Sequence, residues 1–175
     1  MEPIKEVSFE RVYDAPVSRV WEAWTNPEML KQWWGPDNVS IPECEVNLTV
    51  GGTFYIVMEA GEAMGSYKGT QWPMEAEFTV IEPNAKLAYN AKAWTKGQEE
   101  VTQIETVTEI LFAEEDGKTK VNLTSAILKT GPAAGMAGLV PVPGPLRFCR
   151  GRTCLCRCIR LVRHGHSLEL DALEP

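Results

Sequence analysis

The first 138 residues contain no histidine and only one cysteine, Cys44. Histidine is the most common general base, so its absence excludes Ser-His and Cys-His nucleophile pairs from this part of the chain. Paired Cys-x-x-Cys motifs and glycine-rich phosphate loops are also missing there. The sequence therefore predicts no catalytic residues, no metal site and no bound cofactor in residues 1–138.

Long apolar runs are absent as well. No uncharged apolar segment reaches the roughly 18 residues that a membrane-spanning helix requires. The first six residues lack the basic stretch and apolar stretch of a signal peptide. We therefore expect a cytoplasmic protein without membrane insertion. The net charge of −7 makes attraction to nucleic acid unfavourable, so nucleic acid is not an expected partner.

Charge and composition divide the 175 residues into two unequal parts. Residues 1–138 carry a net charge of −10, whereas residues 139–175 carry +3, four of the five cysteines and both histidines. The last 37 residues are too few for a core of their own without metal or disulfides. We expect one folded domain in residues 1–138 and an atypical Arg-, Cys- and Pro-rich tail in residues 139–175.

The tail holds residue types that bind zinc or copper. They are Cys149, Cys154, Cys156, Cys158, His164 and His166. Their Cys-x-Cys-x-Cys spacing lacks the paired Cys-x-x-Cys of structural zinc modules. We therefore predict no metal site in the tail either.

Hydrophobic periodicity predicts an α+β fold. Apolar and polar residues alternate in seven segments, as expected for half-buried strands: 7–13, 41–48, 53–59, 66–81, 86–95, 101–112 and 118–128. Helical spacing occurs at 17–24 and 27–34, where Asn26 and Pro27 provide an N-cap and a first helical position. This order favours an antiparallel sheet with helices on one face. A further covering helix is expected to begin within residues 131–138.

The segment Trp21-Glu22-Ala23-Trp24-Thr25-Asn26-Pro27-Glu28-Met29-Leu30-Lys31-Gln32-Trp33-Trp34-Gly35-Pro36 resembles the opening of a known family. This is the Hsp90-ATPase-activator-homologue-like (AHSA1-like) family of the START-like (SRPBCC) helix-grip superfamily. Similarity continues through Val50–Phe54, Val80–Leu87 and the hairpin at 116–119 to Gly138. The resemblance implies a helix-grip (START/Bet v 1-like) fold. In it, a curved seven-stranded antiparallel sheet, two short helices and a C-terminal helix enclose an apolar cavity.

The tail departs from this family. Relatives continue after residues 135–138 with a helix that reads like Gly-Trp-Ser-Gln-Ser-Leu-Asp-Arg-Leu. Residues 139–148 can be encoded CTG GTC CCA GTC CCT GGA CCG CTT CGC TTC. Without the first base, these codons read Trp-Ser-Gln-Ser-Leu-Asp-Arg-Phe. We therefore predict that residues 139–175 are frameshifted by a one-base insertion, which sequencing of the encoding DNA tests.

Alternation and the family resemblance together assign a set of large apolar residues to the cavity. Helix-grip cavities are lined by the inward residues of the sheet and by the short helices. The expected ligand-binding residues are Trp24, Trp33, Phe54, Ile56, Met58, Trp72, Met74, Phe78, Tyr89 and Trp94. A shift of one residue in register would exchange each inward residue for its neighbour.

The predicted strands also carry polar residues that were considered as ligand anchors or acid-base groups. Tyr67, Gln71, Gln103 and Glu105 are interpreted as solvated strand positions rather than ligand anchors. Five carboxylates on the predicted strands could serve in acid-base chemistry, but the sequence alone does not single out any one of them. They are Glu59, Glu75, Glu77, Glu105 and Glu109. Glu43 and Glu45 flank Cys44, and their charges are expected to raise the pKa of its thiol.

The leading hypothesis is a protein that binds a hydrophobic or aromatic small molecule, such as a lipid or polyketide, in an internal cavity without chemistry. The superfamily also suggests a polyketide cyclase or aromatase, although the missing histidine argues against an enzyme. The family name suggests an Hsp90 ATPase activator. The eukaryotic activators carry an extra amino-terminal domain that this sequence lacks, so Hsp90 is not an expected partner. An incompletely covered concave face would also favour a homodimer.

Overall fold

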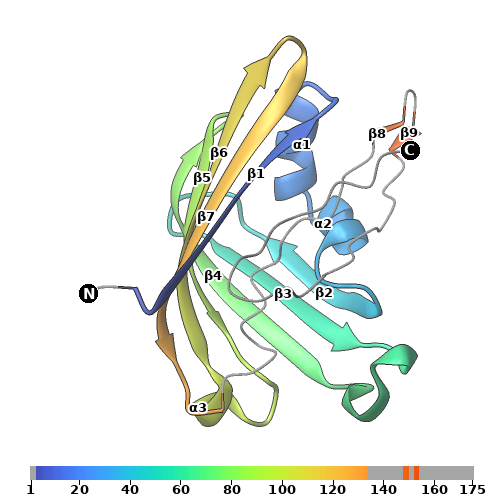
Figure 1. Ribbon diagram of the computed structural model, residues 1–175, viewed down its shortest axis with the longest axis vertical. Helices are drawn as coiled ribbons and strands as arrows, with labels where there is room; N and C mark the ends of the chain where they lie inside the picture. The colour runs from blue at the N-terminus through green and yellow to red at the C-terminus, as the bar shows by residue number, and fades with distance from the viewer. Residues whose placement is uncertain (1–2, 134–147, 150–151, 154–175) are drawn as a thin grey trace, which may run out of the picture.

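The computed structural model describes residues 3–133, 148–149 and 152–153 of the chain. Seven strands form one antiparallel sheet (Figure 1). They are β1 (Lys5–Tyr13), β2 (Val39–Val46), β3 (Thr53–Ala60), β4 (Gln71–Glu82), β5 (Lys86–Ala93), β6 (Ile104–Glu115) and β7 (Lys118–Thr130). Their spatial order is β1-β7-β6-β5-β4-β3-β2, so the first strand pairs with the last. Two short strands, β8 (Phe148–Cys149) and β9 (Arg152–Thr153), pair with each other.

Two helices lie on one face of this sheet, and the sheet curves around them (Figure 1). They are α1 (Val17–Thr25) and α2 (Pro27–Trp33). The Asn26 side chain caps α2, accepting hydrogen bonds from the backbone N–H groups of Glu28 at 2.9 Å and Met29 at 3.3 Å. The predicted cap and the predicted α+β class are thus confirmed, and we refer to the helix side as the concave face.

A distant carboxylate fixes the start of α1. No side chain caps this helix locally, because its N-cap residue is Pro16. Instead, the Glu114 carboxylate on β6 accepts a hydrogen bond from the Val17 backbone N–H at 2.8 Å. The α1 helix is tied to α2 by the Trp33 indole N–H, which donates to the Ala23 carbonyl at 2.9 Å. These two bonds set the position of the helix pair over the sheet.

Three sequence predictions of local structure were wrong. Residues 66–70 are not strand: η1 (Glu62–Tyr67) precedes β4, and Gly65 and Gly69 adopt positive φ angles of 58° and 76°. The turn α3 (Glu99–Thr102) replaces the start of the strand predicted at 101–112. Residues 131–133 form a turn rather than a helix, and the rest of the helix predicted at 131–138 lies outside the described residues.

Strand pairing shows which side chains share the concave face. Tyr89 pairs with Thr108, Thr108 with Ser125, and Ser125 with Val7, so these four residues form one row across β5, β6, β7 and β1. The neighbouring row contains Leu87, Ile110, Leu123 and Phe9. A third row contains Phe112, Val121 and Arg11.

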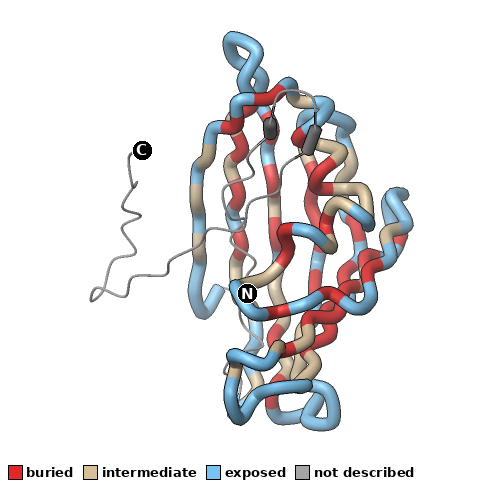
Figure 2. The backbone as a smooth tube through the Cα atoms, turned by 90° about the vertical axis from the view of Figure 1, so that its right-hand side faces the viewer, coloured by how far each residue is buried: buried red, intermediate tan, exposed pale blue. Residues whose placement is uncertain are grey.

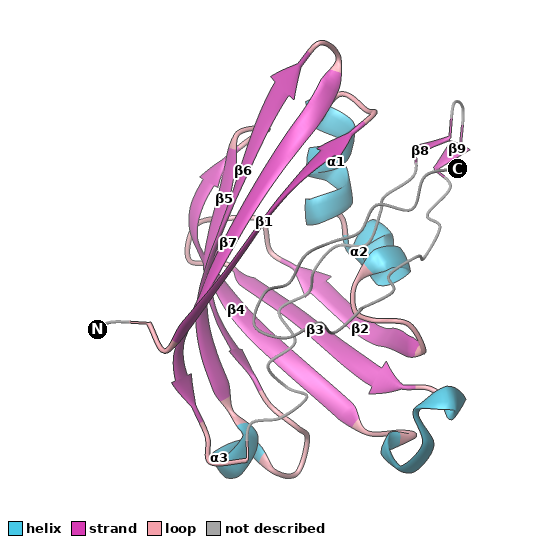
Figure 3. Cartoon of the chain, in the orientation of Figure 1, coloured by secondary structure: helices cyan, strands magenta, loops and turns pink. Residues whose placement is uncertain are grey.

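Buried residues gather along these strands and on the two helices, whereas the hairpin tips are exposed (Figure 2). The buried cluster joins α1 and α2 to all seven strands of the sheet. Figure 3 shows that helix and strand account for most of the described chain, with short connecting loops. None of the described helices is long and apolar enough to cross a membrane.

Candidate functional site

Aromatic rings from both helices and four strands meet on the concave face. Trp24 of α1 packs edge-on against Trp33 of α2, with 4.8 Å between the ring centroids. Trp34 packs edge-on against Phe54 of β3 at 5.3 Å. Phe54 in turn stacks on Phe78 of β4 at 6.1 Å. These contacts form a continuous aromatic wall from α1 to the centre of the sheet.

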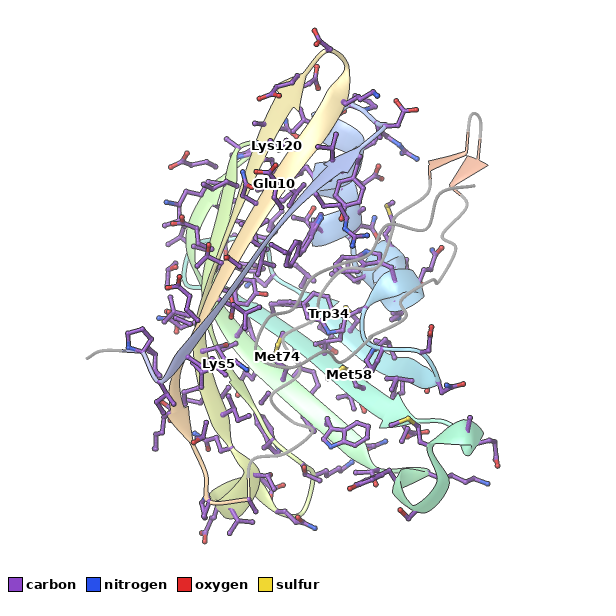
Figure 4. All side chains as sticks on the ribbon, viewed as in Figure 1. Lys5, Glu10, Trp34, Met58, Met74 and Lys120 are labelled. Atoms are coloured by element: carbon purple, nitrogen blue, oxygen red, sulfur yellow. The ribbon has the colours of Figure 1, made fainter. Side chains whose placement is uncertain are left out.

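The structure brings nine of the ten residues expected to bind a ligand into one buried cluster. Each of the nine is at most 7% exposed: Trp24, Trp33, Phe54, Ile56, Met58, Trp72, Met74, Phe78 and Tyr89. Register agrees with the predicted faces, because Met58 pairs with Trp72 and Ile56 with Met74 across β3 and β4. Figure 4 shows Trp34, Met58 and Met74 on the same side of the sheet as α2. Their contact with a ligand remains a prediction.

Trp94 is separated from this cluster. It follows the last residue of β5, is half-buried, and its backbone N–H donates to the Pro73 carbonyl at 3.1 Å. The alternation continued only to Ala93, which pairs with Met74 on the concave side. Counted from Tyr89, the alternation assigns Ala91 and Ala93 to the concave side and Trp94 to the other, so the sequence pattern itself did not support grouping Trp94 with Tyr89.

A row of buried hydroxyl groups crosses the middle of the apolar face. Thr108 and Ser125 are 2% and 1% exposed, and their hydroxyl oxygens lie 2.9 Å apart. Burial raises the pKa of Tyr89, and a hydrogen bond with the Thr108 side chain partly opposes this effect. Tyr89 therefore keeps its proton at neutral pH. The three hydroxyls provide a polar strip on an otherwise apolar surface.

Three further polar groups on this side are buried without a hydrogen-bond partner among the described residues. They are the Tyr13 hydroxyl and the indole N–H groups of Trp24 and Trp34. The three side chains are 2%, 4% and 1% exposed. A buried donor without a partner costs about 1–3 kcal/mol. The concave face thus holds three buried groups able to bond an added acceptor.

The concave face carries more positive than negative side chains, although the chain as a whole has a net charge of −7. Across the described strands, only three charged residues share the inward register: Lys5 and Arg11 on β1, and Glu114 on β6. Glu114 already accepts the α1 backbone hydrogen bond.

Sequence reasoning missed Arg11 and Tyr13, although the alternation in residues 7–13 places both with Val7 and Phe9. Thr108 and Ser125 were missed because the search favoured large apolar residues.

The carboxylates considered for acid-base chemistry lie on the opposite, convex face. Glu59 accepts a hydrogen bond from the Gln71 amide at 2.6 Å, Glu105 pairs with Lys129 at 3.3 Å, and Glu109 pairs with Lys86 at 2.7 Å. Glu75 and Glu77 are exposed on β4. An open hollow of about 490 Å³ lies on this face, lined in part by Glu75, Glu77, Lys92 and Glu105. Its lining mixes these charged residues with apolar ones, including Ala76, Val107 and Leu128.

The lone thiol of the domain is buried on β2. Burial is the main cause that raises the pKa of Cys44 to about 11, with Glu28 and Glu45 adding to the effect and Lys31 opposing it. The expected rise in the Cys44 pKa is confirmed, and Glu45 contributes to it as predicted, but burial is a larger cause than either neighbouring acid. No group of three metal-binding side chains occurs within the part of the chain that the structure describes. The six Cys and His residues of the tail lie outside the residues with described side chains.

Solved structures share this architecture. Protein CV1439 from Chromobacterium violaceum aligns with a TM-score of 0.57 at 20% identity, covering 69% of this chain and 78% of its own. Protein NE0264 from Nitrosomonas europaea gives 0.54 at 27% identity, covering 71% and 75%. Protein Ms6760 from Mycobacterium smegmatis gives 0.57 at 19% identity, covering 71% and 73%. The curved sheet with its short helices is that of helix-grip proteins.

Within this class, the sequence matches one family model, described as "Activator of Hsp90 ATPase homolog 1-like protein", over residues 14–138. The chain belongs to this family. A search of curated proteins found no match. The fold and the family are consistent with a ligand-binding or activator-like role. The matched region stops at residue 138, and the frameshift of residues 139–175 remains a prediction.

Proposed function

We propose that the protein binds a hydrophobic or aromatic small molecule against the concave face of its sheet, without chemical change. The observation that carries this proposal is the presence, beside an aromatic wall, of three buried donors that have no partner in the described part of the chain: Tyr13 Oη, Trp24 Nε1 and Trp34 Nε1. Small-molecule sites are mostly apolar with a few polar groups that orient the ligand. A ligand with one acceptor atom would satisfy a donor that is otherwise unpaired.

Among the described residues, the concave face offers no activated base or nucleophile, and this supports binding without chemistry. On the described concave face, the titratable tyrosines keep their protons at neutral pH, because burial raises the pKa of Tyr13 and Tyr89. Burial also keeps the Cys44 thiol protonated. The one inward acid, Glu114, is held by the α1 backbone. The tyrosine hydroxyls and the thiol therefore act as hydrogen-bond donors, and the Glu114 carboxylate is an acceptor that the Val17 N–H already occupies.

The test is a titration with N-phenyl-1-naphthylamine, a neutral probe whose fluorescence rises in an apolar site. We expect saturable binding and a raised melting temperature, because a ligand that binds only the folded state stabilises it. The variant Ala91→Leu adds bulk on the concave face and should weaken binding. Its control, Asn90→Leu, adds the same side chain to the adjacent convex position.

Two results would contradict the proposal. One is the absence of saturable probe binding to the wild-type protein. The other is equal loss of affinity in both variants, which would place the probe elsewhere. Conversion of a polyketide-like ligand would favour the cyclase alternative, and stimulation of an Hsp90 ATPase would favour the activator role that the family description names.

A further inference from the structure

Arg11 is a cation on the inner face of an acidic protein. It pairs with Val121 across β1 and β7, between the positions of Phe9 and Tyr13, whose partners Leu123 and Thr119 are buried on the concave side. Arg11 itself is half-buried. Within the described residues, no carboxylate lies within ion-pair distance of its guanidinium. A partly desolvated guanidinium without a counter-charge favours an anionic partner.

The neighbouring inward residue of the same strand supplies a donor. Tyr13 lies two positions along β1, so its side chain shares the face of Arg11 at a separation of about 7 Å along the strand. Its hydroxyl is buried and has no partner among the described residues. Burial raises the pKa of Tyr13, so the group remains a donor at neutral pH. A guanidinium and a phenol together provide the donors that a carboxylate requires.

Several charged residues on the opposite, convex face of the sheet form ion pairs. Glu10 points away from the helices and forms an ion pair with Lys120 of β7 at 2.8 Å (Figure 4). The convex acids Glu105 and Glu109 are paired with lysines in the same way. Arg11 differs from these residues because no carboxylate of the described chain lies within ion-pair distance of its guanidinium.

Resting on the function proposed above, we propose that Arg11 and Tyr13 bind the carboxylate of an amphipathic ligand whose apolar part lies on the concave face. The row that contains Arg11 continues through Val121 to Phe112. Two strand spacings separate Arg11 from Phe112, which is about 10 Å. Trp24 packs over Phe112 with a centroid distance of 6.2 Å. An extended chain of about ten carbons whose carboxylate is bound at Arg11 would span this distance to the aromatic wall.

The experiment compares two competitors that differ only in their head group. Decanoate and decanol each displace N-phenyl-1-naphthylamine from the full-length protein, and the ratio of their inhibition constants is the readout. We expect decanoate to bind the wild type about tenfold more tightly than decanol, because hydrogen bonds to charged groups are the stronger ones. Arg11→Gln should reduce this ratio to about one, and Arg11→Lys should restore part of it.

Two more variants complete the test. Tyr13→Phe removes only the hydroxyl and should lower the ratio several-fold. Lys92→Gln removes one positive charge from the convex face, where Lys92 pairs in register with Glu75 and Glu105, and should leave the ratio unchanged. Melting curves of each variant show that it is folded.

The outcomes separate this inference from the function on which it rests. If the probe does not bind the wild type, the proposed function fails. If the probe binds but decanoate and decanol displace it equally, the function stands and the carboxylate site is refuted. An unchanged ratio in folded Arg11→Gln would also refute it. A lowered ratio in Lys92→Gln would show that overall charge, rather than Arg11, attracts the anion.

Discussion

The buried hydroxyl pair at the centre of the sheet permits a double-mutant cycle. Thr108→Val and Ser125→Ala each remove one hydroxyl from a pair whose oxygens lie 2.9 Å apart. Each single change leaves the other hydroxyl buried without this partner, since both residues are at most 2% exposed. We expect each to lower the free energy of unfolding by about 1–3 kcal/mol.

Thr108→Val should be the more costly of the two. The Thr108 side chain also hydrogen-bonds to Tyr89, so its loss removes a partner from two groups rather than one. The double variant removes both members of the pair and should cost less than the sum of the single changes. The expected coupling is about 1 kcal/mol, in the range found for residues in contact.

Urea unfolding followed by tryptophan fluorescence measures these free energies. A matched control is Thr124→Val with Ala126→Ser, because both positions flank Ser125 on β7 but face the convex side. That pair should show no coupling. Additive costs for Thr108→Val and Ser125→Ala would refute the hydrogen bond as a stabilising contact on the concave face.

Three other predictions concern the fold. Asn26→Ala removes the cap of α2 and should lower the free energy of unfolding by about 1 kcal/mol, whereas Asn26→Ser should retain most of it. Gly52→Ala should destabilise by more than about 1 kcal/mol in urea unfolding, because a Cβ there would collide with the Asn47 carbonyl oxygen. Stability should fall as pH rises from about 9 to about 11, because the folded protein holds the Cys44 proton to a higher pH than the unfolded chain, and Cys44→Ala should flatten this slope in melting curves. Equal slopes in both proteins would contradict the last prediction.

Much of the fold could be predicted from local pattern. Alternation located the strands because one face of each is buried, and the Asn26-Pro27 pair marked the start of α2 because both residues suit a helix N-terminus. The strands predicted from residues 66 and 101 begin too early, because Tyr67 and Val101 were assigned to strands. Both residues lie in short helical turns, η1 and α3.

The site was predictable in its apolar part only. Phe54, Met58 and Tyr89 follow from alternation, whereas the meeting of Trp34 with Phe54 depends on how the helices pack on the sheet. The inward position of Arg11 also follows from alternation. That Arg11 has no counter-charge among the described residues could not be predicted, because it depends on which β7 residues lie beside it.

Indole N–H signals in a ¹H–¹⁵N correlation spectrum test the central claim most directly. The buried indole N–H groups of Trp24 and Trp34 have no hydrogen-bond partner within residues 3–133, whereas the Trp33 indole donates to the Ala23 carbonyl. On titration with decanoate, the account predicts that the Trp24 and Trp34 signals shift saturably and more than the Trp33 signal. Shifts confined to backbone amides of convex residues such as Glu75 and Lys92, with the indole signals unmoved, would contradict binding on the concave face.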